Sequence, residues 1–419
     1  MKKSIRSLAL SLTTFMLAAS PLCAANVQQL TSVNEPLDTV NLENSTTLHL
    51  SVGIGSGAFR LASDPEGVFY TITDRGPNID AKVTEDLLGK KYDFKSGKIF
   101  PTPNFAPTIY RCKLVDDIAV VEQKIQLKTT DGMPISGISN PETEVAYSLA
   151  GNRLQDDPAG VDAEAIIKLA DGTFWIGEEY GPSLLHIAAD GRVINRLVPK
   201  GVAASLQDAG YPVVEALPEI IRHRPLNRGI ESIAVSPDEK FLYFALQSPL
   251  ALPDKAAYKA GKNVRLFTLD REKEQVVAEY VYQLDDPDTF VVDNSKKKQK
   301  QNAVKVSEMT AVGMDTLVVL ERISKTTKFY KVDLSQATSI LNSKWDSVAT
   351  SPSLEQQTEI QEGTLHKHLL LNSDDNKGIM KKIEGLAWFG GNQWLMVNDN
   401  DFGIAGDATK MVKVSMEIE

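Results

Sequence analysis

The sequence predicts an all-β fold of the β-propeller class, and two features support this prediction. One motif occurs five times: a short apolar segment, a turn rich in Asp, Gly or Pro, and a β-branched or aromatic strand that ends in polar residues. A second hairpin follows most copies, and two successive hairpins form the four-stranded antiparallel sheet of one propeller blade.

The five copies are spaced widely along the chain. They read SGAFRLASDPEGVFYTITDRG from Ser56, EAIIKLADGTFWIGEE from Glu164, ESIAVSPDEKFLYFALQ from Glu231, EMTAVGMDTLVVLER from Glu308 and EGLAWFGGNQWLMVNDND from Glu384. The spacing exceeds the roughly 40–45 residues of a bare blade, so long insertions or a sixth blade must fill residues such as 131–160 and 345–380. We therefore expect six blades, within a range of five to seven, in one domain over residues 26–419.

The remaining segments predict how each sheet and the whole ring are completed. The second hairpins are expected in TIYRCKLVDDIAVVEQKIQL, LLHIAADGRVINRLVP, VRLFTLDREKEQVVAEYVYQL and KFYKVDLSQATSIL. The last strand, KMVKVSMEIE, is expected to pair with the early strand TTLHLSVG, so that N- and C-terminal strands close the ring and remove exposed edges. The polar tract DNSKKKQKQN at 293–302 predicts an exposed loop.

Residues 1–25 have the pattern of a secretory signal peptide. Basic residues precede the apolar stretch LALSLTTFMLAA, which is too short to span a membrane, and small residues follow it. The residues before Cys23 do not form a lipobox, so cleavage after Ala24 or Ala25 is favoured over lipid anchoring at Cys23. The sequence thus predicts a periplasmic or secreted protein without a membrane span.

Composition excludes several classes of function. Removing the leader makes the formal net charge of -10 more negative by three and leaves Cys112 without a partner for an internal disulfide. An acidic surface disfavours nucleic acid and anionic membranes. An α/β hydrolase is disfavoured because long amphipathic helices are few, and the string GIGSG at 53–57 misplaces the serine of a nucleophile elbow.

The repeated acids predict a metal site on the propeller axis. Four glutamates open their copies in one register, and carboxylates in a ring would repel by roughly 4 kcal/mol per close pair at intermediate dielectric. Calcium would offset this repulsion because it binds many oxygen ligands in loose geometry, and the absence of soft ligands disfavours zinc or copper. The alternative is that each glutamate caps backbone N–H groups. The predicted ligands are Glu164, Glu231, Glu308, Glu384, Asp74 and Asp399.

Arginines and a paired acid supply the predicted catalytic groups. Arg60, Arg75 and Arg228 either hold an anionic substrate or neutralise the ring glutamates. Glu178 is the predicted base, since the like charge of Glu179 beside it favours its taking up a proton. Ser56 as a nucleophile has no histidine visibly paired with it.

Several motifs together resemble those of a known family. TDRGPN, GVDAEAI with GTFWIGEEYGPSLLHI, NRGIESIAVSPDEKFLYFALQSPL and KIEGLAWFGGNQWLMVNDNDFG resemble exported proteins of the family called esterase-like activity of phytase, from about Leu50 to the end. The resemblance implies a β-propeller that hydrolyses esters or phosphoesters. The more distantly similar propeller phytases hold calcium with acidic residues to bind phosphate.

These observations favour an exported, monomeric, metal-dependent hydrolase of esters or phosphoesters. Its substrate would be a small anion or ester, bound at an acidic axial site flanked by arginines, with calcium as the cofactor. The alternative is a non-enzymatic binding or scaffold propeller in which the cation is structural, because propellers host both kinds of role. A quinone-dependent dehydrogenase would need an arginine, histidine and aspartate set that the sequence does not offer.

Overall fold

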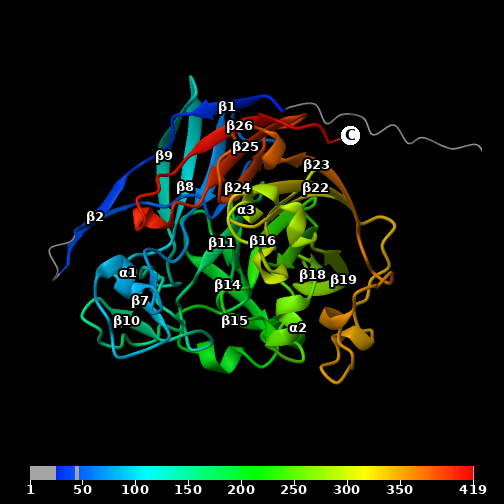
Figure 1. Cartoon of the computed structure of the whole chain (residues 1–419), viewed down its shortest axis with the longest axis horizontal. Helices are drawn as coiled ribbons and strands as arrows, with labels where there is room; N and C mark the ends of the chain where they lie inside the picture. The colour runs from blue at the N-terminus through cyan, green and yellow to red at the C-terminus, as the bar shows by residue number, and fades with distance from the viewer. Residues whose placement is uncertain (1–24, 43–46, 419) are drawn as a thin grey trace, which may run out of the picture.

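Strands dominate the computed structural model, which describes residues 25–42 and 47–418 (Figure 1). The fold is therefore all-β with few helices, as predicted. The expected signal peptide and Cys23 lie outside the described residues. Among the described helices, none has the length and apolar character needed to cross a membrane.

Five sheets of four or five strands, antiparallel except for one strand, contain most of the described strands. The first sheet contains β4 (Gly57–Phe59), β5 (Val68–Ile72), β8 (Thr108–Val115) and β9 (Ile118–Gln126). The second contains β11 (Ala163–Lys168), β12 (Phe174–Glu178), β13 (Ser183–Ile187), β14 (Val193–Pro199) and, in parallel, β15 (Val213–Leu217). The third contains β16 (Ile230–Val235), β17 (Phe241–Leu246), β18 (Asn263–Asp270) and β19 (Gln275–Gln283).

The last two sheets follow the same plan. The fourth contains β20 (Lys305–Ala311), β21 (Thr316–Arg322), β22 (Thr327–Asp333) and β23 (His366–Asn372). The fifth contains β24 (Ile383–Trp388), β25 (Gln393–Asn398), β26 (Met411–Ser415) and β1 (Val27–Leu30). The described helices are short: α1 (Thr84–Leu88), α2 (Lys255–Ala260), α3 (Val291–Asn294) and eight 3-10 turns.

The five sheets follow one another around a common centre. The first strands β4, β11, β16, β20 and β24 are the inner strands, and each contacts the next, with β24 returning to β4. Figure 1 shows the sheets in this order, from β8 and β9 at upper left, past β14 and β15 at the bottom, to β26 at the top. Every repeat predicted from the sequence thus opens on an inner strand.

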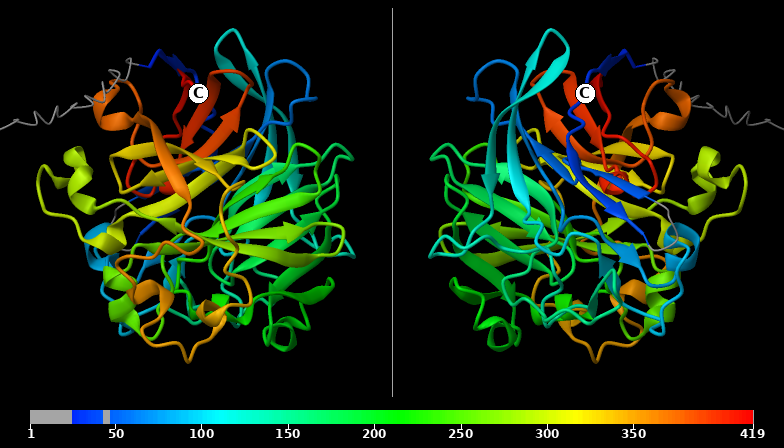
Figure 2. Two further views of the ribbon diagram at one scale, coloured as in Figure 1. Left: turned by 90° about the vertical axis from the view of Figure 1, so that its right-hand side faces the viewer. Right: turned by 90° about the vertical axis from the view of Figure 1, so that its left-hand side faces the viewer.

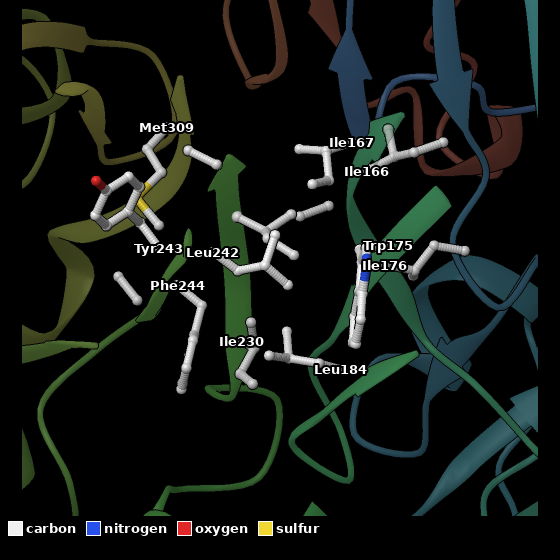
Figure 3. Close-up of a cluster of buried hydrophobic side chains, with 14 of the residues drawn as sticks. Ile166, Ile167, Trp175, Ile176, Leu184, Ile230, Leu242, Tyr243, Phe244 and Met309 are labelled. Atoms are coloured by element: carbon white, nitrogen blue, oxygen red, sulfur yellow. The ribbon is translucent and has the colours of Figure 1, made fainter. Parts of the chain in front are cut away.

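Apolar side chains fill the space between adjacent sheets. Figure 3 shows this for the second and third sheets, where Ile167 and Trp175 lie on the side of Ile230 and Leu242. All four are at most 1 % exposed. β-Branched and leucine side chains stand on both faces of these strands because both faces are covered, which explains why the strands are continuously apolar in sequence.

The two ends of the chain meet in the fifth sheet, as predicted. β26 lies between β25 and β1, and Val27 pairs with Val414. The predicted partner was wrong, however, because β3 (Thr47–Ser51) forms a hairpin with β2 (Pro36–Asn41) instead. In that hairpin Leu48 and Leu50 point into a separate apolar cluster.

Two other predicted segments differ from the structure. In KFYKVDLSQATSIL only the first half is a strand, and β22 pairs with β23 after an insertion over residues 334–365. The segments considered for a sixth blade contribute single strands, β10 (Ala146–Ser148) and β23, so the described residues form five sheets of this size. The tract at 293–302 is mostly exposed, but Asp293 is buried and accepts hydrogen bonds from the N–H groups of Lys325 and Thr326.

A cap module lies beside one end of the inner strands (Figures 1 and 2). It consists of the β2–β3 hairpin, α1, and the small sheet of β6 (Ile79–Asp80), β7 (Lys98–Phe100) and β10. Its own apolar cluster contains Leu48, Leu50, Ile79, Leu88 and Ile99. Most of the module is an insertion between β5 and β8, which accounts for part of the long repeat spacing.

Candidate functional site

A shared irregularity brings polar side chains to the centre of the inner strands. The pairing of four of the five inner strands with the next strand shifts by one residue, at Glu164, Glu231, Ser307 and Glu384. Such a bulge leaves one residue outside the ladder and redirects its side chain. In the first sheet Ser56 takes this position, directly before the paired residue Gly57.

Glu308 is one residue out of this register, so its predicted metal role is not supported by its position. Its carboxylate accepts hydrogen bonds from the N–H groups of Met309 (2.9 Å) and Ala58 (3.4 Å). Burial raises the pKa of Glu308 well above its usual value. For this glutamate the structure supports the alternative stated above, in which the side chain caps backbone N–H groups, here one of its own strand and one of β4.

A polar cavity of about 190 Å³ opens beside the bulged residues, and we call it the axial cavity. Its lining has eight carboxylates and three cationic side chains: Asp74, Arg75, Asn78, Lys98, Asp162, Glu164, Glu179, Asn227, Glu231, Gln247, Lys305, Glu384, Asp399 and Asp401. Five of the six predicted ligands therefore lie together, the exception being Glu308.

Three of the carboxylates converge closely. Ligand oxygens of Asp74, Asp162 and Glu164 all lie within 4.8 Å of one another. Burial, reinforced by neighbouring acids, raises the pKa values of Asp74 and Glu164 well above the usual range, and burial raises that of Asp162 to about 6. Carboxylates this close either retain protons or share a cation.

The opposite side of the axial cavity carries its own positive charge. The Arg322 guanidinium contacts the Glu384 carboxylate and lies 3.9 Å from that of Glu231. Ser307 bridges them, since it accepts from Arg322 (2.9 Å) and donates to Glu231 (3.1 Å). Lys305 Nζ is 4.0 Å from Glu231. Asp74 and Glu164, by contrast, form no ion pair with a cationic side chain among the described residues.

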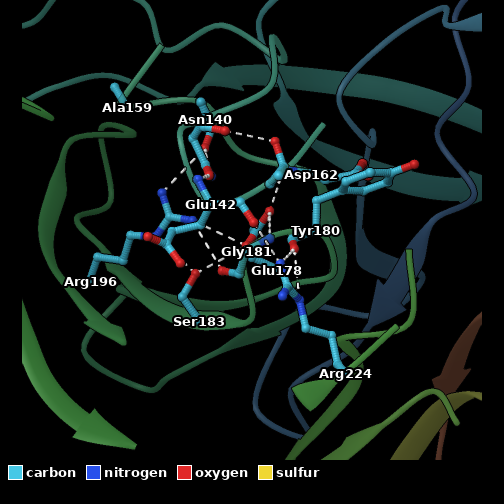
Figure 4. Close-up of polar contacts among 12 residues, drawn as sticks. Asn140, Glu142, Ala159, Asp162, Glu178, Tyr180, Gly181, Ser183, Arg196 and Arg224 are labelled. Carbon is cyan, nitrogen blue, oxygen red and sulfur yellow. Dashed lines mark hydrogen bonds and ion pairs between the residues drawn. The ribbon is translucent and has the colours of Figure 1, made fainter. Parts of the chain in front are cut away.

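The adjacent glutamates of GTFWIGEEYGPS have separate environments (Figure 4). Glu178 is fully buried outside the axial cavity, where it pairs with Arg196 at 3.1 Å and accepts from the N–H groups of Gly181 (3.0 Å) and Asp162 (3.3 Å). Glu179 lines the cavity, and its buried Oε1 has no hydrogen-bond partner among the described residues. Burial and Glu231 raise its pKa.

Successive side chains of a strand point to opposite sides, so only one member of the pair can face the cavity. The predicted base, Glu178, instead holds the backbone of Asp162 in place. The position suited to accept a proton in the cavity is one residue later, at Glu179.

The three predicted arginines separate in space. Arg75 lines the cavity, pairs with Asp162 (3.3 Å) and Glu144 (3.2 Å), and lies 3.6 Å from the centre of the Tyr180 ring. Arg228 donates to the Asn227 carbonyl (2.6 Å) and the Tyr258 hydroxyl (3.3 Å).

Arg60 lies outside the axial cavity, over the Phe389 ring at 5.1 Å. It donates to the Asp64 carbonyl. The contacts of Arg60 are therefore those of a packing residue. Glu231, in turn, has Arg322 as its nearby arginine, and Arg228 forms no ion pair with it among the described residues.

Several residues of the site went unrecognised in the sequence, among them the charged residues Lys98, Asp162, Lys305 and Arg322. Asp162 had a visible signal, because the D-x-E spacing of GVDAEAI puts Asp162 and Glu164 on the same side of a strand. The sequence signal for Lys305 and Arg322 was weaker: Lys305 begins one repeat strand and Arg322 ends the next. Lys98 had none, because it enters the site from the inserted cap module.

An all-β protein with an acid-lined cavity at the meeting point of its inner strands is the class that this fold and site define. The chain belongs to the Phytase-like family, described as esterase-like activity of phytase, whose pattern it matches over residues 55–402.

Curated and solved proteins show weaker similarity. An uncharacterized secreted protein of Arthroderma benhamiae is 25% identical over 255 residues, which cover 52% of this chain and 48% of that protein. The chain thus spans about half the length of this relative. A PQQ-bound aldose sugar dehydrogenase from Streptomyces coelicolor has a TM-score of 0.35 at 10% identity, over 95% of this chain and 100% of that one. A luciferin-regenerating enzyme has a TM-score of 0.36 at 10% identity, over 94% and 97%.

Proposed function

We propose that the protein is a secreted hydrolase of esters or phosphoesters, built as a five-bladed propeller, that uses a divalent cation in the axial cavity. The observation that carries this proposal is the convergence of Asp74, Asp162 and Glu164 on one point. Membership of the phytase-like family and the secreted relative support the hydrolase class and the export.

The donor set fits a hard cation. Asp74, Asp162 and Glu164 offer only carboxylate oxygens, which calcium and magnesium prefer, and calcium tolerates their loose geometry. The orphaned Oε1 atoms of Glu179 and Gln247 border the same cavity and supply further unused oxygens. Leaving so many buried acids ionised without a counter-ion would cost several kcal/mol per charge.

When bound, calcium would polarise the ester or phosphoryl oxygen of the substrate. The chain's own cationic groups, Arg75, Lys98 and Lys305, line the same cavity and would bind the anionic part of the substrate. Glu179 would take the proton from the attacking water, because it lines the cavity, its Oε1 has no hydrogen-bond partner among the described residues, and burial raises its pKa well above the usual value.

Two buried glutamates of the inner strands provide a matched test. Glu164→Gln should remove calcium-dependent stabilisation and hydrolysis of a panel of phosphoesters and carboxyl esters, because it takes one charge from the converging set. Glu308→Gln, equally buried but outside the cavity, should keep both. The measurements are metal content of the purified protein, calorimetric calcium binding, and turnover with and without chelator.

The outcomes separate the two candidate roles. Equal calcium binding by the two variants would refute the metal site. Calcium binding that Glu164→Gln abolishes, without turnover of any ester, would favour the scaffold role in which the cation is structural.

A further inference from the structure

A second cavity of about 210 Å³ adjoins the axial cavity, and we call it the side chamber. The two share four lining residues: Asp74, Asn78, Lys98 and Asp401. They are therefore adjacent, and only these side chains stand between a charged group in the axial cavity and the side chamber.

The far walls of the side chamber differ chemically from those of the axial cavity. The cap module contributes Ile79, Val83 and Leu87 together with one acid, Asp80, and the loop after β25 contributes Phe402, Ile404 and Ala405. Ile79, Leu87 and Ile404 also belong to the apolar cluster of the cap module, so this wall is the edge of a packed core. Apolar walls offer nothing to a polyhydroxylated group, whereas they stabilise an apolar one by excluding water from it.

The loop that joins the two cavities is held in an unusual conformation. Asp401 (φ 47°) and Phe402 (φ 52°) are consecutive non-glycine residues in the left-handed region, a backbone conformation that is unfavourable for both. Asn400 holds them there, since its side chain accepts from the Phe402 N–H (3.0 Å) and donates to the Ser51 hydroxyl (3.3 Å).

This conformation has a specific result. Asp401 lines both cavities, while Phe402 is buried in the wall of the side chamber, where its ring meets that of Phe105 edge-on at 5.1 Å. A charged residue and an aromatic residue are thereby fixed side by side at the junction of the polar and apolar spaces.

We propose that the side chamber binds the apolar organic group of the substrate, an aryl or short alkyl group, while its phosphate or ester group occupies the axial cavity. This inference rests on the proposed function. A dry cavity of about 150 Å³ lined by Leu, Ile and Phe binds benzene in another protein, so the side chamber has room for one aromatic ring. The preferred substrates are then monoesters of apolar alcohols or phenols and not of polyols such as inositol.

The experiment compares three probes by calorimetric titration of the calcium-loaded protein: phenyl phosphate, glycerol 2-phosphate and inorganic phosphate. Phenyl phosphate should bind at least roughly tenfold more tightly than the other two, from burial of one ring. Val83→Trp should abolish this preference by filling the chamber, and Val83→Asp should reduce it by making the wall polar. Val83 is 39% exposed, so both variants should fold.

The matched control is Val115→Trp, at the tip of the β8–β9 hairpin, where Val115 is 46% exposed and lines neither cavity. It should bind all three probes as the wild type does. Equal affinity for phenyl phosphate and glycerol 2-phosphate, or an unchanged preference in Val83→Trp, would overturn the side-chamber assignment and leave the proposed function standing. Binding of none of the three probes would refute anion binding in the axial cavity, and the inference with it.

Discussion

Replacing Arg196 by methionine should destabilise the protein strongly while weakening calcium binding far less. Arg196 is fully buried and makes five hydrogen bonds, to Glu178, Ser183, Tyr211 and the carbonyls of Gly160 and Gly181. Methionine fills much of the volume of the arginine stem but supplies no charge. The substitution therefore isolates the polar contacts from the packing.

The size of the effect follows from the partner that is left behind. Removing one member of a buried ion pair costs about 3–5 kcal/mol. Glu178 keeps its hydrogen bonds from Gly181, Ser183 and Asp162, which favours the lower half of that range. At an unfolding entropy of about 2.1 cal/mol/K per residue, the loss corresponds to a fall in Tm of roughly 4–5 °C.

Differential scanning calorimetry with and without calcium measures both effects. Arg192→Met is the control, because Arg192 pairs with Asp190 on the surface, where such pairs contribute about 0–1 kcal/mol. Glu178→Gln combined with Arg196→Met should lose less stability than the sum of the single variants. A Tm of Arg196→Met within 1 °C of the wild type would refute the structural role of the Arg196–Glu178 pair. A Glu178→Gln variant of normal stability that no longer binds calcium would refute it as well.

Three further predictions concern other parts of the molecule. Gly55→Ala should lower the free energy of unfolding by several kcal/mol, because the added Cβ would lie 1.9 Å from a backbone carbonyl oxygen. Gly390→Ala, where the added Cβ meets open space, should lower it by only about 1 kcal/mol. Urea unfolding measures both. Cys112 should resist thiol reagents at pH 8 until the protein is denatured, because burial raises its pKa to about 12; rapid labelling of the native protein would contradict this. Burial alone would raise the pKa of Asp285, but two lysines and a tyrosine lower it to about 2. The stabilisation that ionised Asp285 contributes is therefore present above about pH 4 and lost as pH falls through 2. In Asp285→Asn the Tm should consequently fall less steeply between pH 4 and pH 2 than in the wild type.

The repeat pattern predicted the inner strands because a blade must bury both of its faces. The five segments beginning at Ser56, Glu164, Glu231, Glu308 and Glu384 all open on inner strands. The repeat pattern does not show which residue of a strand faces the cavity, because a bulge shifts the pairing by one residue without changing the composition of the segment. Glu308 was therefore grouped with the wrong set, since Ser307 before it holds the bulged position.

Contacts between distant segments were beyond the repeat pattern. Lys98 reaches the axial cavity from an insertion, and the partner of β22 lies beyond residues 334–365. Adjacent residues were also hard to separate: the sequence marked Glu178 and Glu179 as one acidic pair, although strand alternation sends the first to Arg196 and the second to the cavity.

The place of β26 also constrains how the chain reaches its native state. This strand lies between β25 and β1, so the last strand of the described chain inserts between a neighbour in sequence and a strand from the opposite end. Until residues 411–415 have left the ribosome, β1 and β25 both present unpaired N–H and C=O groups to other chains. Contacts of such large sequence separation form slowly. The nascent protein therefore depends on being shielded from association until synthesis is complete, whatever the stability of the finished fold.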